Sequence, residues 1–164
     1  MPETLFFTAD DEANRLLATD PFALMVGMLL DQQVPMEWAF GAPRLLKERL
    51  GGTLDPAAVA ARPVEEVEEI FRSKPALHRY PGSMAKRTHA LAQFLVDNYD
   101  GRAENVWAGI ESGAVKAFYV HLAEGRSDNE LSRNEFADLV ELKALTPATV
   151  VIHGLGCATV LTVG

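Results

Sequence analysis

The sequence predicts an all-α protein, a single domain of several helices. Apolar residues recur at helical spacing in successive segments, cap-and-proline pairs mark helix starts, and glycines mark helix ends. With 164 residues, of which 48% are hydrophobic, the chain is long enough to bury a core and short for two domains. We therefore expect one domain over residues 1–164.

The most apolar helix is expected directly after Asp20-Pro21, an N-cap followed by proline at the first helical position. The run from Phe22 to Leu30 is apolar on all sides, which is typical of a buried, central helix. Since Pro35 disfavours helix in the residue before it, the next helix is expected from Pro35 to Leu50, ending at Gly51-Gly52.

Shorter helices are expected next. Asp55-Pro56 repeats the cap-and-proline signal, and a helix from Val64 to Phe71 follows Pro63 with its apolar residues on one face. The segment from Lys74 to Gly82 holds two prolines and a glycine and predicts a loop. Helical spacing then resumes from Ser83 to Tyr99.

The last third of the chain gives weaker signals. One or two turns are expected over Arg102 to Trp107, an amphipathic helix over Ser112 to Glu124, and a further helix after the capping box that starts at Ser132. The β-branched residues between Val150 and Val163 leave helix and strand both open for the final segment.

Composition excludes several classes of protein. No apolar run approaches the roughly 18 residues of a membrane span, and Met1 to Ala9 does not have the pattern of a secretory signal, so we expect a cytoplasmic protein with no membrane partner. A single cysteine, Cys157, and four scattered histidines predict no disulfide and no metal cluster. No cofactor is expected.

The net charge of −8 argues against nucleic-acid binding through the overall field, but charge is uneven. No acidic residue lies between Glu69 and Asp97. Such a stretch either faces phosphates, where cations displace counterions, or is a solvated face that is basic by chance. Its basic residues are Arg72, Lys74, Arg79, Lys86 and Arg87, with His78 and His89.

Two polar motifs go beyond packing. Gln32 and Gln33 end the apolar helix, where their amides either reach the base edges of an opened pair or cap orphan carbonyls of the helix. The run from Arg79 to Arg87 is a tight turn that leads into a helix start, whose N–H groups attract phosphate. The alternative for this second motif is a solvated helix face.

The segments Asp20 to Glu37 and Tyr80 to Arg87 together resemble the helix-hairpin-helix (HhH-GPD) base-excision DNA repair proteins of actinobacterial type. The resemblance covers about residues 10–107 and extends, more loosely, to endonuclease III and the alkyladenine glycosylases. It implies an all-helical protein that binds double-stranded DNA, bends it, and turns a damaged base into a pocket for cleavage of its N-glycosidic bond. The DNA-binding residues expected here are Gln32, Gln33, Arg79, Tyr80, Ser83, Lys86 and Arg87.

After Trp107 the chain departs from the family pattern of a Leu-Pro-Gly-x-Gly hairpin followed by a catalytic aspartate. Its hairpin-like string runs from Ile152 to Thr159, with Gly154 and Gly156 as candidate phosphate-binding residues. In this alignment Ala158 stands where lyase-active relatives carry their Schiff-base lysine, and no acidic residue follows Gly156. The resemblance therefore implies no lyase step and leaves the catalytic residues unknown.

Residues 108–164 are thus a divergent segment with its own site, a fused unrelated sequence, or the product of a shifted reading frame. The expected function is that of a DNA-binding base-excision repair protein resembling DNA N-glycosylases, a monofunctional hydrolase if it is active. The alternatives are a non-catalytic relative that binds DNA or another protein, and an inactive truncated or frameshifted product. The sequence carries no signal for the damaged base or the oligomeric state.

Overall fold

The computed structural model describes residues 5–106, 149–154 and 157–162, and the side chains of residues 5–106. The chain divides into two compact units, Met1–Asn105 and Val106–Gly164. The proposed division of the sequence into residues 10–107 and 108–164 stays a prediction.

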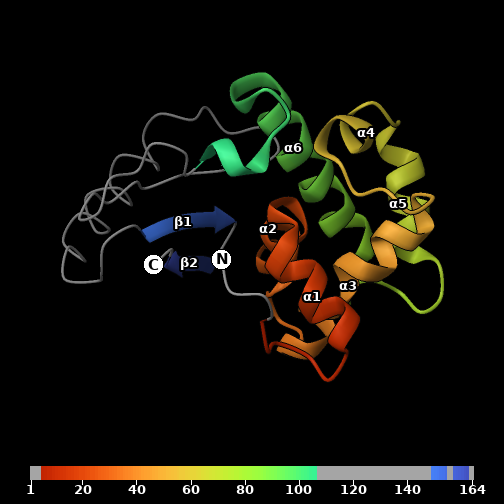
Figure 1. The fold of residues 1–164 in the computed structure, drawn as a ribbon. Helices are drawn as coiled ribbons and strands as arrows, with labels where there is room; N and C mark the ends of the chain where they lie inside the picture. The colour runs from red at the N-terminus through yellow and green to blue at the C-terminus, as the bar shows by residue number, and fades with distance from the viewer. Residues whose placement is uncertain (1–4, 107–148, 155–156, 163–164) are drawn as a thin grey trace. The chain divides into compact units, whose positions relative to one another are not determined.

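The first unit is built from helices, as the sequence predicts (Figure 1). A short 3-10 turn, η1, closes it at Ala103–Val106. Among these described helices, none is long and apolar enough to cross a membrane. The α-helices are α1 (Asp11–Thr19), α2 (Pro21–Leu30), α3 (Met36–Arg49), α4 (Pro56–Ala60), α5 (Val64–Arg72) and α6 (Pro81–Tyr99).

Helix α2 is the centre of this unit. Every residue from Phe22 to Leu30 is buried, which confirms the expectation for an apolar run without a polar face. It packs against α1, α3 and α6, while α4 and α5 pack against α6. Gly27 permits the close approach of α3, because a Cβ there would lie 2.7 Å from a ring carbon of Phe40. The loop after α2 is therefore attached to a rigid, buried element.

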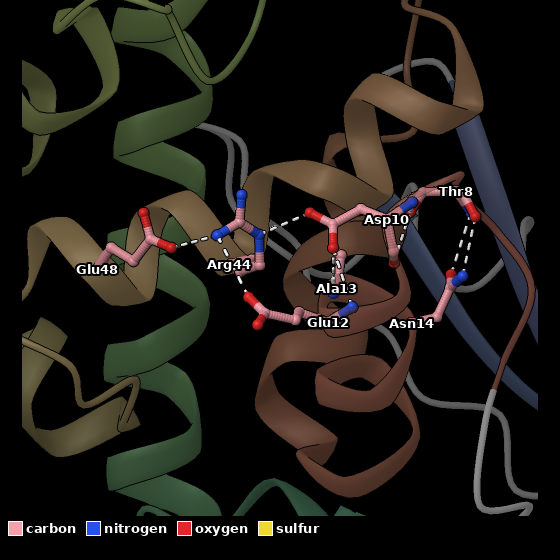
Figure 2. A network of polar contacts seen from close by, with 7 residues as sticks. All are labelled: Thr8, Asp10, Glu12, Ala13, Asn14, Arg44 and Glu48. Carbon is pink, nitrogen blue, oxygen red and sulfur yellow. Dashed lines mark hydrogen bonds and ion pairs between the residues drawn. The ribbon is translucent and has the colours of Figure 1, made fainter.

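Helix α1 was not among the expected elements. It is short, and no proline follows its capping Asp10, whereas proline follows the capping aspartates of α2 and α4. Asp10 stabilises its start, since one carboxylate oxygen accepts hydrogen bonds from two N–H groups of the first turn at 2.9 and 3.1 Å. The other oxygen accepts a hydrogen bond from Arg44 Nε of α3 at 2.7 Å (Figure 2). This network joins α1 to α3.

Helix α6 begins two residues earlier than expected. Pro81 occupies its first position, where the missing N–H of proline costs nothing, so Pro81 and Gly82 belong to the helix and not to the preceding loop. The helix ends at Asp100, whose φ of 55° is left-handed, and Gly101 N donates a hydrogen bond to Leu95 O at 2.9 Å.

The described part of the second unit consists of two strands, β1 (Thr149–Gly154) and β2 (Cys157–Thr162). They pair antiparallel, in a register that runs from Thr149↔Thr162 to Gly154↔Cys157. The β-branched residues of this segment, for which the sequence left helix and strand both open, thus form strands. The helices expected over residues 112–124 and after Ser132 lie outside the described residues.

Candidate nucleic-acid interface

The two motifs that the sequence singles out lie next to each other. The first is the loop of residues 31–35 between α2 and α3, the glutamine loop. The second motif, the run from Arg79 to Arg87, begins at the end of the loop of residues 73–80, the basic loop, and continues into α6. His78 of the basic loop joins them, because its Nε2 lies 3.1 Å from Leu30 O and 3.0 Å from Gln32 O. Its Nδ1 accepts a hydrogen bond from Tyr80 N at 2.9 Å. We refer to these three contacts as the His78 bridge.

The hydrogen-bond partners of His78 determine which of its ring nitrogens carries the proton. Carbonyl oxygens only accept, so Nε2 carries the hydrogen, and Nδ1 must be bare to accept from the Tyr80 N–H. The side chain is 1% exposed, and this burial holds its pKa below the ordinary value. The carbonyls of Gln32 and Leu30 act in the opposite direction, and the charge of Arg87 lowers the pKa further. The bridge therefore requires a neutral imidazole.

Gln32 is used inside the protein. Its side chain is 7% exposed, and its Nε2 donates a hydrogen bond to Leu29 O at 2.7 Å. Its Oε1 accepts a hydrogen bond from Arg87 Nη1, also at 2.7 Å. Both ends of the amide are thus satisfied within the fold, as in the interpretation that the glutamines cap the helix end.

Gln33 differs from Gln32 in its exposure and in its backbone conformation. It is exposed, and its φ of 57° lies in the left-handed region, which costs a residue with a side chain about 1–2 kcal/mol. Such strain persists only where surrounding contacts impose it, and it is enriched at functional sites. The structure therefore separates two residues that the sequence leaves equivalent.

The end of the basic loop presents a cation and an aromatic ring. The guanidinium of Arg79 lies 5.5 Å from the centre of the Tyr80 ring, and both residues are exposed. Tyr80 is also the N-cap of α6, without a side-chain hydrogen bond to the first turn. That turn contains no acidic residue, and Ser83 within it is exposed. Its N–H groups at the second and third helical positions have no carbonyl partner within the helix.

The stretch between Glu69 and Asp97 has no acidic residue of its own, but an acidic residue from outside it lies close to it. Glu68 of α5 reaches two of its cations, lying 3.0 Å from Arg72 Nη2 and 3.8 Å from Lys86 Nζ. Arg87 turns inward to Gln32, and His89 Nε2 lies 2.9 Å from Arg62 O. Lys86 therefore has an acidic neighbour that the sequence stretch does not reveal, because Glu68 of α5 faces α6.

Two further exposed side chains border the loops, and sequence reasoning missed them. Met36 is 49% exposed and Trp38 is 40% exposed, at the start of α3. Trp38 Nε1 donates a hydrogen bond to Ala76 O of the basic loop at 3.1 Å. The rings of Trp38 and Tyr80, the latter 43% exposed, lie 6.5 and 6.1 Å from the His78 ring. Helical spacing gave no signal for Met36, which stands three, four and seven residues before the buried Ala39, Phe40 and Pro43 and so shares their face of α3.

Arg49, at the end of α3, anchors the start of the basic loop. Its guanidinium donates hydrogen bonds to Ile70 O at 2.8 Å, to Ser73 O at 3.1 Å and to Pro75 O at 2.7 Å. These partners are 21 to 26 residues away in the sequence, so no local pattern could reveal them. The loop is thus held at its start by Arg49 and at its end by His78.

The candidate residues Gly154 and Gly156 belong to the second unit of the chain. Gly154 ends β1 and pairs with Cys157, and Gly156 lies outside the described residues. The described residues of the hairpin-like string from Ile152 to Thr159 lie within β1 and β2. The role of these glycines in phosphate binding stays a prediction. Within the part of the chain that the structure describes, no group of three or more acidic, histidine or cysteine side chains gathers in a metal-binding arrangement.

Comparison with known proteins gives one match. The family model described as HhH-GPD superfamily base excision DNA repair protein matches residues 26–151, more than half of the chain. The match begins within α2 and includes the glutamine loop, the basic loop and all of α6. Neither the curated proteins nor the solved structures give a significant match.

Proposed function

The chain belongs to the HhH-GPD superfamily of base excision DNA repair proteins, and on that premise we propose that it binds damaged double-stranded DNA through the glutamine and basic loops. The observation that carries the proposal is the strained, exposed Gln33, fixed next to the basic loop by the His78 bridge. Its amide offers a donor and an acceptor together, as the edge of a base does. Gln33, and not Gln32, is the residue that we propose to probe the opened pair.

The surrounding residues suit the other requirements of this role. Arg79 and Lys86 are exposed cations for phosphates, and the start of α6 adds N–H groups at Ser83. Trp38 and Tyr80 present rings on which an unstacked base can lie, a contact worth about 1–3 kcal/mol per base. Tyr80 and Arg79 act together, since the guanidinium already lies over the ring.

The reaction that we propose is hydrolysis of the N-glycosidic bond of a damaged base. The bond electrons leave with the base, the oxygen of water bonds to the sugar carbon, and a carboxylate takes the proton of that water. No residue of this chain is assigned as that carboxylate. Ala158 stands at the position of the lyase lysine in the family pattern, so the reaction would end at an abasic site.

Binding is tested by fluorescence anisotropy with two duplexes of one length, one intact and one carrying a stable abasic-site analogue, over a series of salt concentrations. We expect preference for the second duplex and an affinity that falls with salt. Gln33→Ala should remove the preference while leaving the salt dependence, whereas Lys86→Ala should reduce the salt slope by about one and leave the preference. Affinity that ignores ionic strength would refute the proposed phosphate contacts.

A second candidate is a non-catalytic member that binds DNA without releasing a base. It is favoured by the hairpin-like string from Ile152 to Thr159, whose described residues lie in the strands β1 and β2 and not in helices. Base-release assays on duplexes with uracil, alkylated or oxidised bases separate the two candidates. Persistent, lesion-selective binding without release of any base would support the second.

A further inference from the structure

We propose that His78 is a positioning residue, which holds the glutamine loop and the basic loop in one arrangement so that Gln33 and Tyr80 meet DNA together. The inference rests on the proposed function and adds a residue that the sequence presented only as part of a basic stretch. It follows from three hydrogen bonds made by one ring, one to the last carbonyl of α2, one to a carbonyl of the glutamine loop and one to an N–H of the basic loop.

On the first side, His78 holds the peptide group directly before Gln33. Its Nε2–H donates to the carbonyl oxygen of Gln32, and the plane of this peptide is one of the two that define φ of Gln33. The same peptide chain is turned sharply there, because Gln32 N donates to Leu30 O at 2.7 Å. The contact thus acts on the backbone angle that is strained, and it sets the direction in which the exposed side chain leaves the loop.

On the second side, His78 holds the backbone N–H of Tyr80 at 2.9 Å. Tyr80 is the N-cap of α6, so this contact fixes the residue at which the loop ends and the helix starts. Since one rigid ring carries both contacts, neither loop can shift alone without breaking a hydrogen bond of the buried imidazole.

Neighbouring contacts support the same arrangement through side chains. Arg87 of α6 reaches Oε1 of Gln32, and Trp38 of α3 reaches the carbonyl of Ala76. These two contacts are made by side chains of the neighbouring helices, whereas the His78 ring joins backbone groups of both loops. Without the His78 bridge, the two loops would have to become ordered when DNA binds. The conformational entropy lost in that ordering would weaken binding.

The test uses variants of the full chain that each keep a different part of the bridge. In His78→Asn the side-chain oxygen can accept from Tyr80 N–H, and in His78→Gln the amide can donate to the two carbonyls. His78→Phe keeps a ring and neither contact. Val59→Ala, in the fully buried core of α4, is the matched control for lost stability away from the loops.

The first readout is amide hydrogen exchange of the free protein, which needs no DNA. We expect the Tyr80 amide to exchange at least tenfold faster in His78→Phe and His78→Gln than in the wild type, and to stay protected in His78→Asn and Val59→Ala. A Tyr80 amide that stays protected in His78→Phe would overturn the bridge, whether or not the protein binds DNA.

The second readout is the preference for the duplex with the abasic-site analogue over the intact one. All three His78 variants should lose about tenfold or more of this preference, about 1.4 kcal/mol, because positioning needs both sides of the bridge. Val59→Ala should keep it at a temperature where it is folded. Preference that survives in His78→Phe, or that falls equally in Val59→Ala, would reduce His78 to a core residue. A wild type without any preference would refute the proposed function, while the exchange result would still decide the bridge.

Discussion

Replacing Gln33 by glycine should stabilise the protein and impair the proposed recognition of damaged DNA. The left-handed conformation costs a residue with a side chain about 1–2 kcal/mol, and glycine avoids this cost but loses roughly 0.5–1 kcal/mol through the freedom of its unfolded state. At a φ of 57° the net gain for Gln33→Gly is therefore about 0.5–1 kcal/mol. For a helical unit of this size that raises Tm by about 2–8 °C.

The chain provides a matched control for this experiment. Asp100, at the end of α6, has a φ of 55° and is exposed, so Asp100→Gly relieves the same backbone strain far along the chain from the loops. Gln33→Ala removes the amide and keeps the strain, so it should leave Tm unchanged. We expect both glycine variants to melt higher and only the two Gln33 variants to lose preference for the abasic-site duplex, measured by thermal unfolding and anisotropy.

A lower Tm for Gln33→Gly would refute this reasoning, since it would mean that the Gln33 side chain stabilises the fold and is not held there at a cost. Unchanged DNA preference in Gln33→Ala would likewise remove Gln33 from the interface. The two readouts are independent, because the first depends on the backbone and the second on the amide.

Three further predictions concern pH and anchoring. Because burial lowers the pKa of His78 below the ordinary 6.5, its contribution to the free energy of unfolding should be complete above pH 6.5 and fall as pH drops through the folded-state value. Urea unfolding from pH 7.5 to 5 should show this loss in the wild type relative to His78→Phe, in which the nearby Arg87 and all carboxylates are the same. Asp20 caps α2 by accepting two hydrogen bonds of 3.0 Å, and burial raises the pKa of its carboxyl group. Because the charge is unfavourable there but the cap is not, Asp20→Asn should be at least as stable as the wild type at pH 7, whereas Asp20→Ala should lose about 1–2 kcal/mol. Equal losses of stability in the two variants would contradict this reasoning. Arg49→Ala leaves three carbonyl oxygens without their hydrogen-bond donor and should lower the free energy of unfolding by about 1–3 kcal/mol. Arg44→Ala should lower it by less than about 1 kcal/mol, because the carboxylate partners of Arg44 are largely exposed. The reverse order in urea titrations would show that the basic loop does not depend on Arg49.

The helices could be predicted where local signals are strong. Proline after a capping aspartate places the starts of α2 and α4 correctly, and the apolar run of α2 predicts its central position. Helix α1 escaped prediction because Asp10 and Arg44 stabilise it from outside its own pattern. The strands β1 and β2 remained ambiguous because β-branched residues suit either structure in a short apolar segment.

The site could be predicted only as two separate motifs. The sequence places Gln32 and Gln33 at the end of a helix, but it does not show that one is buried and the other exposed. Gln32 is held inside the fold partly by Arg87, which is more than 50 residues away. His78 looks like one more cation of a basic stretch until its two carbonyl partners and its burial are known. Pairing across such distances is a property of the tertiary structure, which local composition does not encode.

Glu68 has a consequence for how the protein would search DNA. Its carboxylate lies between Arg72 and Lys86, where a phosphate oxygen would otherwise be attracted, so every duplex must displace an internal anion to use these cations fully. This cost is the same on intact and on damaged DNA, but only a gap would add the proposed contacts of Gln33 that offset it. A self-supplied anion would therefore shorten the time spent on intact DNA and leave the protein free to move to the next site.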